Sequence, residues 1–483
     1  MPDQHSRFAS RDAVVVGSGP NGLCAAIALA QAGCSVTVLE AAATLGGGSR
    51  SAELTLPGFT HDVCSTVLAL ALVSPALRAL PLAEHGLELV HPDVPLAHPL
   101  DDGGAVILHR SVAETGESVG GQDARAYERL LGPLVRNSDA LMAEILGPLR
   151  PPRHPWALAR FGVVGMRSAA GLARARFEGP RARALLAGAA AHSMMRLNQT
   201  PTAAVGLVLM TAAHAVGWPF ARDGSQRLVD ALASYLTSLG GEIVTGHRVE
   251  RVEELDEAGV VLFDVAPRNL VEIAGARFTP RYRQALTSYR HGPGIFKIDW
   301  ALDEPIPWRA PEVRGAGTVH LGGKLEELMR SEDDATRGRL SERPFVLLTQ
   351  PTVADPGRAP SGRHVGWAYC HVPSGCTQDM TQQIEDQVER FAPGFRDVIA
   401  ARATMSAPEM EGYNANYVGG DINGGIQDLR QLYTRPVAKP NPYTTSDPRL
   451  FLCSSSTPPG GGVHGMSGWY AAKAALRRLN RST

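Results

Sequence analysis

Two glycine-rich stretches, one near each end of the chain, hold the residues whose types and spacing suit chemistry. The first, GSGPNG at 17–22, follows the apolar run AVVV and precedes an alanine- and leucine-rich stretch. Glycines in this pattern allow a tight turn, a close approach of backbone to phosphate, and close helix–strand packing. The start of a helix also attracts anions through its free N–H groups. The predicted phosphate-binding residues are Gly17, Gly19, Pro20, Asn21 and Gly22.

An acidic residue completes this first motif. Glu40 ends the next predicted strand, residues 35–40, and lies 18 positions (40 minus 22) beyond Gly22. A carboxylate at this place accepts hydrogen bonds from ribose hydroxyls and repels a 2′-phosphate. Strand, glycine turn, helix and acidic residue together predict a dinucleotide-binding β-α-β unit. The alternative is an ordinary strand–turn–helix without a ligand.

The second stretch, PPGGGVHGMSG at 458–468, lies between a predicted strand and a predicted C-terminal helix. Consecutive glycines let the main chain lie against a flat ring, because no Cβ intervenes. A helix that begins near Met466 directs its positive end at that ring and favours negative charge there. His464 is the titratable residue inside the loop and is the catalytic candidate; the alternative is a packing role. The loop itself has a structural alternative, a turn that only caps the domain.

The residues around both motifs resemble known flavoproteins. After Glu40, the glycines at 46–48 followed by Arg50 resemble the second half of the FAD fingerprint in the large family related to glutathione reductase. The C-terminal stretch resembles the FAD segment of bacterial phytoene desaturases and carotenoid isomerases, in which a Pro-Gly-Gly-Gly-Val run lies against the flavin. This resemblance covers nearly the whole chain. The further cofactor-binding residues that it implies are Gly47, Gly48, Arg50, Val249, Gly461, Gly462, Val463, His464 and Met466.

The resemblance implies a fold and an activity. The expected fold is α/β, with a Rossmann-like FAD-binding domain of glutathione-reductase type and an α+β substrate domain built on a mixed or antiparallel sheet. The expected activity is FAD-dependent dehydrogenation or isomerisation of a lipophilic or unsaturated small molecule by hydride transfer to flavin, with oxygen or a quinone as electron acceptor. Candidate substrate residues are Tyr369, Tyr413 and Asn416, for which core or surface-loop positions are the alternative.

Two other functions remain open. A flavin amine oxidase shares the fold, and so does a non-catalytic escort-type protein that has lost its flavin. The intact glycine motif, Glu40 and Arg50 argue against the escort protein. The sequence contains no second strand–GxGxxG–helix unit and no CxxC pair, which argues against a disulfide reductase and against a zinc site.

Patterns typical of a nucleotide-binding domain recur in separated segments of the chain. The predicted FAD-binding domain combines residues 1–74, 221–280 and 441–483, and the substrate or cap domain combines 75–220 and 281–440. Within them, the hydrophobic pattern predicts a helix at 224–241, a strand or hairpin at 242–252 and a buried strand at 260–265.

Composition limits the remaining classes. The chain has 483 residues, 44% hydrophobic and 20% charged, with a net charge of −1, which gives no electrostatic case for nucleic acid. No apolar run reaches about 18 residues and the N-terminus lacks a signal-type apolar region, so we expect a cytoplasmic protein. The helical part at about 150–185 is rich in arginine and apolar residues. It fits either a helix on an anionic membrane surface or a solvated basic face.

Overall fold

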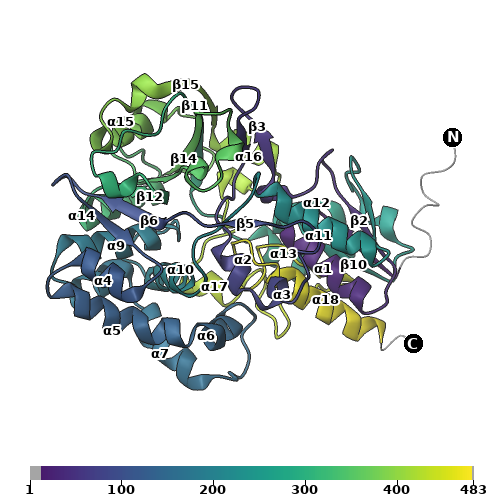
Figure 1. Cartoon of the computed structure of the whole chain (residues 1–483). Helices are drawn as coiled ribbons and strands as arrows, with labels where there is room; N and C mark the ends of the chain where they lie inside the picture. Colours follow the sequence, from purple (N-terminus) through teal and green to yellow (C-terminus); the bar gives the residue numbers. More distant parts are fainter. Residues whose placement is uncertain (1–11, 481–483) are drawn as a thin grey trace.

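The computed structural model describes residues 12–480 and contains a parallel sheet of five strands (Figure 1). Its strands run in the order β16–β10–β1–β2–β9, and every neighbouring pair is parallel. The strands are β1 (Ala13–Val16), β2 (Val36–Leu39), β9 (Glu242–Val244), β10 (Val260–Phe263) and β16 (Leu450–Leu452). The central strands are buried throughout and purely apolar or nearly so, as expected for a sheet that is covered on both faces.

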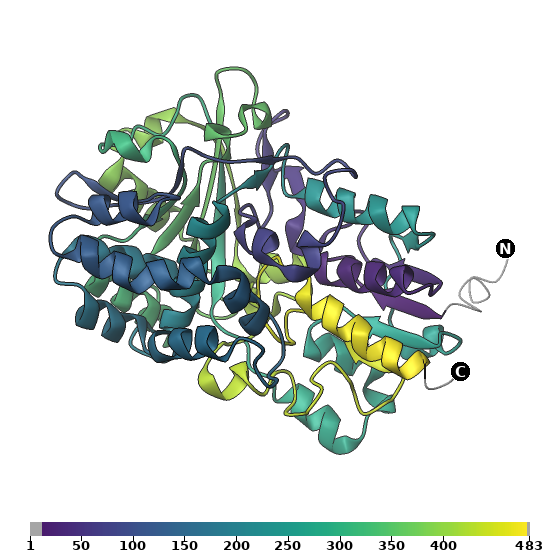
Figure 2. The ribbon, with the colours of Figure 1, turned by 60° about the horizontal axis from the view of Figure 1, so that its bottom comes forward.

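Helices cover both faces of this sheet. One face carries α1 (Pro20–Gln31), α11 (Gln226–Ser238) and α18 (Met466–Leu479), and the other carries α12 (Pro267–Ala274) and α13 (Pro280–Thr287). The purple α1 and the yellow α18 lie side by side although they come from opposite ends of the chain (Figure 2). The predicted start of α18 at Met466 is confirmed, and Gly33, with φ of +87°, follows the end of α1 as predicted.

A second sheet of seven strands runs in the order β15–β11–β14–β13–β12–β6–β7. Its neighbouring pairs are antiparallel, except that β12 and β6 are parallel. This confirms the predicted mixed sheet. The strands are β6 (Val94–Pro99), β7 (Ala105–Leu108), β11 (Gly294–Leu302), β12 (Ala316–Leu321), β13 (Val346–Thr349), β14 (His364–Val372) and β15 (Ile399–Met405).

A helical layer packs beside the second sheet (Figure 1). It consists of α4 (Val112–Val119), α5 (Asp123–Arg136), α6 (Ser138–Ile145), α7 (Pro155–Gly165), α8 (Ala169–Arg176), α9 (Pro180–Ala191) and α10 (Thr202–Val216). The remaining helices are α2 (Ala69–Val73), α3 (Pro75–Arg78), α14 (Leu325–Thr336), α15 (Thr381–Phe391), α16 (Ala407–Tyr413) and α17 (Leu429–Leu432). Two further sheets have two strands each and are called ribbons here. The β3–β4 ribbon pairs β3 (Ser51–Glu53) with β4 (Thr60–Asp62), and the other pairs β5 (Leu89–Val90) with β8 (Phe220–Ala221). Within residues 12–480, no helix combines the length and hydropathy needed to cross a bilayer.

The segment after β9 differs from its prediction. The sequence predicted a strand or hairpin over 242–252, but the strand ends at Val244 and a 3₁₀ helix begins at Val252. Gly246, with φ of +68°, turns the chain, and the backbone N–H of His247 donates to the carbonyl of Glu40 at 2.9 Å. The chain therefore bends across the end of β2 instead of continuing along the sheet, which brings Val249 to the site described below.

The two sheets draw on different parts of the chain. All five strands of the parallel sheet come from residues that the sequence assigns to the FAD-binding domain, and all seven strands of the second sheet come from the remainder. The domain boundaries themselves stay a prediction.

Candidate active site

One large cavity, of about 1360 Å³, lies at the carboxyl ends of the parallel strands and extends to the second sheet and the helical layer. It exceeds the range of about 300–1,000 Å³ that is usual for small-molecule pockets, so it has room for more than one ligand. The predicted cofactor residues that line it are Gly17, Gly19, Pro20, Asn21, Glu40, Gly47, Gly48, Arg50, Val249, Gly461, Gly462, Val463 and His464. The candidate substrate residues Tyr369, Tyr413 and Asn416 line it too, whereas Gly22 and Met466 do not.

The glycine turn before α1 is tightly packed. Gly17 has φ of +103°, and a Cβ there would lie 2.9 Å from the carbonyl oxygen of Asp264. A Cβ on Gly22 would collide with the carbonyl of Gly17. Gly22 thus permits the close packing of helix and strand that the sequence predicted for it, while Gly17 and Gly19 leave backbone at the cavity wall.

Glu40 is buried at the end of β2 and is held by several donors. The Ser18 backbone N–H and hydroxyl donate to it at 3.0 and 2.6 Å, and the Arg50 guanidinium lies 3.2 Å away. Arg50 also donates to the carbonyls of Thr44 and Leu45. Arg50, which the resemblance implied as a cofactor-binding residue, therefore also fixes the glycine segment that follows Glu40.

Asp264 is a site residue that the sequence analysis missed. It directly follows β10 and is buried, and its carboxylate accepts a hydrogen bond from the N–H of Gly22 at 2.9 Å. Burial, with a contribution from Glu40, raises the pKa of Asp264 to about 7. An acidic residue at the carboxyl end of a buried parallel strand was the available signal, because ligands of such sheets bind at that edge.

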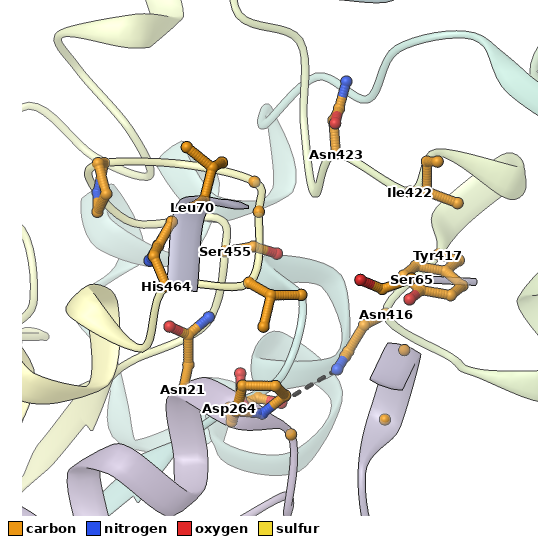
Figure 3. Close-up of a pocket in the computed structure, with 18 of the residues that line it drawn as sticks. Asn21, Ser65, Leu70, Asp264, Asn416, Tyr417, Ile422, Asn423, Ser455 and His464 are labelled. Atoms are coloured by element: carbon orange, nitrogen blue, oxygen red, sulfur yellow. Dashed lines mark hydrogen bonds between the residues drawn. The ribbon is translucent and has the colours of Figure 1, made fainter. Parts of the chain in front are cut away.

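The candidate substrate residues Tyr413 and Asn416 are bonded to the cofactor side of the cavity, and Figure 3 shows the bond from Asn416 to Asp264. Asn416 donates from Nδ2 to the Asp264 carbonyl at 3.0 Å and accepts from the N–H of Ala266 at 2.8 Å. The hydroxyl of Tyr413 donates to the carbonyl of Gly47 at 2.9 Å. Their hydrogen bonds connect this segment to the glycine turns, and the contact of either residue with substrate stays a prediction.

The C-terminal glycine loop passes close to neighbouring backbone. A Cβ on Gly461 would lie 2.7 Å from the carbonyl oxygen of Asn423. His464 is buried in the loop: its Nε2–H donates to the carbonyl of Gly460, and its Nδ1 accepts from the N–H of Met466, both at 3.1 Å. Burial lowers the pKa of His464 to about 4. Both ring nitrogens of a neutral His464 are therefore occupied within the loop, a geometry that favours its packing role.

The far wall of the cavity is largely apolar. Trp367 and Tyr369 on β14 stack with ring centroids 5.9 Å apart, and both line the cavity. Side chains from α7 and α10 face the same space, among them Leu158, Phe161, Val205 and Val208. The lining also includes residues that are exposed at the surface, such as Leu149 and Tyr433, 70% and 44% exposed, so the cavity reaches the surface between the loop before α7 and α17.

The polar end of the cavity fits FAD. Three segments that are far apart in sequence supply a helix N-terminus, a buried carboxylate and a glycine loop to one space. The side-chain oxygen of Asn21 faces this end, is buried, and has no hydrogen-bond partner within residues 12–480. The free N–H groups at the start of α1 suit a pyrophosphate, and the glycine loop, where a Cβ on Gly461 would lie 2.7 Å from the Asn423 carbonyl oxygen, leaves room for a flat ring.

The comparison with family models agrees with the fold. Residues 15–80 match the model of a NAD(P)-binding Rossmann-like domain. The chain is also similar to a solved oxidoreductase from Methanosarcina mazei, with a TM-score of 0.66 and 16% identity over 96% of this chain and 99% of that one, a likeness of fold alone. Fold and family model together define a protein with a Rossmann-like dinucleotide-binding domain.

Sequence relatives define the family. The chain is 32% identical to hydroxyneurosporene desaturase of Cereibacter sphaeroides, over 96% of this chain and 97% of the relative. It is 28% identical to mouse pyridine nucleotide-disulfide oxidoreductase domain-containing protein 2, over 97% and 94%. The chain belongs to the phytoene desaturase-like family of FAD-dependent oxidoreductases and is an enzyme of that class. The resemblance stated from the sequence is thereby confirmed.

Proposed function

We propose that this enzyme binds FAD in the polar half of the cavity and oxidises a lipophilic, unsaturated small molecule in the apolar half. When bound, FAD supplies the acceptor for a hydride. The start of α1 holds the pyrophosphate, Glu40 holds the ribose, the backbone of Val249 contacts adenine, and Gly461 and Gly462 leave room for the flavin ring. His464 holds the loop in shape through its two ring nitrogens.

One observation supports the substrate class. The cavity is lined both by the predicted flavin loop and by a wall of aliphatic and aromatic side chains that includes Trp367 and Tyr369. Such a wall binds an extended hydrocarbon through buried apolar area rather than through charge. The rings of Trp367 and Tyr369 are stacked at 25° to each other rather than facing one another across the cavity, which argues against an aromatic cage for an amine.

Anaerobic mixing of the FAD-loaded enzyme with single compounds tests this proposal. We expect phytoene or a hydroxylated neurosporene to bleach the flavin absorbance near about 450 nm, and benzylamine to leave it unchanged. Bleaching by the amine alone would contradict the proposal and favour amine oxidation. Admitting oxygen or a quinone to the reduced enzyme then identifies the electron acceptor from the faster reoxidation.

The surface mouth of the cavity suits a lipid bilayer. Trp156 and Val163 on α7 are 84% and 72% exposed, and Leu149, in the loop before α7, is 70% exposed. The cations Arg153 and Arg160 are exposed on the same segment. Exposed apolar side chains among cations are typical of helices that lie on anionic membranes, and a lipophilic substrate would enter directly from such a surface.

A further inference from the structure

Arg435, which follows α17, carries a buried positive charge, since the residue is only 1% exposed. Its Nη2 donates to the hydroxyl of Tyr289 at 2.9 Å and to the carbonyl of Gly424 at 3.2 Å. Within residues 12–480, its Nε and Nη1 groups are buried without a hydrogen-bond partner, and no carboxylate forms an ion pair with it. Burying an unpaired charge destabilises a fold, so such a group indicates a functional role.

The unpartnered side of this guanidinium lies directly behind the C-terminal glycine loop. A Cβ on Gly460 would lie 2.8 Å from Nη1 of Arg435, so the first glycine of the run makes room for the cation. The next two glycines, Gly461 and Gly462, line the cavity, whereas Arg435 does not. The backbone of the loop therefore separates the positive charge from the space where the flavin ring is proposed to bind.

Two titratable side chains beside Arg435 are neutral at pH 7. Burial raises the pKa of Tyr289, so its phenol accepts the hydrogen bond of the guanidinium without supplying a negative charge. Burial, with a contribution from Arg435, lowers the pKa of His464 to about 4. The charge of Arg435 thus acts on a residue of the glycine loop, and neither neighbour cancels that charge.

The acidic group in these surroundings is bonded elsewhere. Asp421 acts on Tyr289 together with Arg435, so it belongs to the same region. Its carboxylate accepts hydrogen bonds from three backbone N–H groups at 2.8 to 2.9 Å and lies 3.6 Å from Nδ1 of His291. In the part of the chain that the structure describes, the guanidinium therefore keeps a positive charge that no anion pairs with directly.

We propose that Arg435 raises the reduction potential of bound FAD by balancing the negative charge that the flavin ring gains on reduction. The inference rests on the proposed function. Hydride transfer breaks a C–H bond of the substrate and moves its electron pair to FAD, so the substrate is oxidised and the reduced ring gains one negative charge. The second hydrogen leaves the substrate as a proton to water, and its bonding pair becomes the π bond. Arg435 acts through the field of its charge across the glycine loop, without touching the substrate.

The first test measures the midpoint potential of the FAD-loaded protein against a reference dye and needs no substrate. We expect Arg435→Met to lower the affinity for reduced FAD relative to oxidised FAD at least tenfold, which for two electrons is a fall of about 30 mV. Arg435→Lys keeps the charge and should stay closer to the wild type, and Arg430→Met, which removes an exposed cation from α17, is the control. A purely structural arginine would affect both redox states alike, so an unchanged potential in Arg435→Met would overturn the inference.

The second test uses the wild type and so does not depend on the folding of a variant. A reduced flavin that stays anionic takes up one proton with two electrons, so at about pH 6 the potential should change by about 30 mV per tenfold change in proton concentration. A neutral reduced flavin takes up two protons and gives about 59 mV, and this steeper slope in the wild type would overturn the inference. A protein that takes up no FAD would overturn the proposed function as well, whereas FAD uptake with the steeper slope overturns only the role of Arg435.

Discussion

At the scale of single residues, the site depends on how closely backbone segments approach one another. Gly461 is the clearest case, since its neighbour is the backbone oxygen of Asn423 and not a flexible side chain. Asp264 is the second case, a carboxyl whose burial beneath the glycine turn sets its protonation. Each makes a separate prediction.

Gly461→Ala should weaken FAD binding at least tenfold, which corresponds to about 1.4 kcal/mol, because the loop must move to admit a Cβ 2.7 Å from the Asn423 carbonyl oxygen. Isothermal titration of the apoprotein with FAD measures the effect. Gly315→Ala is the matched control, since its Cβ would make only an ordinary contact at 3.9 Å with Asp93. Equal FAD affinities of the two variants would contradict the assignment of the loop around Gly461 to FAD binding.

Asp264 should make stability depend on pH. Its pKa is about 7 in the folded protein, against an ordinary value of 3.8, so between these values the folded state binds more protons than the unfolded state. Its contribution to the free energy of unfolding is therefore present at low pH and lost as pH rises toward 7. We expect Asp264→Asn to gain stability relative to wild type between about pH 5 and about pH 8, measured by urea unfolding of the FAD-free protein. A constant difference between the two proteins would refute the raised pKa.

At the scale of elements, α7 has two different sides. Phe161 and Val164 are buried in the core, and Leu158 and Phe161 face the cavity. Trp156 and Val163, seven positions apart and so on one side of the helix, face solvent. The helix thus connects the substrate cavity to an exposed apolar surface.

The double variant Trp156→Ala/Val163→Ala should bind anionic vesicles less than the wild type does, because it removes the apolar area that enters the bilayer interface. Vesicle flotation measures the bound fraction, and we expect it to fall at least threefold, which is about 0.7 kcal/mol. Leu340→Ala, which removes a side chain that is 38% exposed and lies outside α7, is the control. Equal flotation of the wild type and the double variant would exclude α7 as the membrane surface.

At the scale of the whole molecule, a buried charged network joins the β3–β4 ribbon to the seven-stranded sheet. Arg358 lies 2.5 Å from Asp62 on β4 and 2.8 Å from Asp355, and all three are buried. On β11, Lys297 pairs with Asp299, which lies 3.4 Å from His61. The network thus connects β4 to β11 of the seven-stranded sheet.

Arg358→Met should lower the free energy of unfolding by about 3–5 kcal/mol, because it leaves the Asp62 carboxylate buried without its cation. Chemical denaturation measures the change. Arg363→Ala is the control, because the ion pair of Arg363 with Asp303 lies about half exposed and such pairs contribute about 0–1 kcal/mol. Similar losses in both variants would show that the buried network contributes no more to stability than an exposed ion pair does.

The sequence predicted those parts of the molecule that local patterns encode. The glycine turn, Glu40, the start of α18 and the mixed sheet follow from spacing, periodicity and resemblance, and the structure brings most of the predicted cofactor residues to one cavity. The turn at Gly246 was missed because alternation over 242–252 predicts a strand, while the carbonyl of Glu40 takes the hydrogen bond that diverts it.

The sequence could not predict contacts between segments that lie far apart in the chain. His98 and His320 lie on β6 and β12, and no spacing in the chain shows that their two imidazoles meet beside Gly188. Asp264 had a local signal at the end of β10, but its bond to Gly22 joins positions 242 residues apart. Such pairs become visible only once the order of strands is known.

The absorbance spectrum of the purified enzyme tests the central claim most directly. We expect a flavin band near about 450 nm and, after heat release, about one FAD per chain, because the glycine turn, Glu40 and the glycine loop face one cavity. A folded protein that is colourless and binds no added FAD would contradict the account.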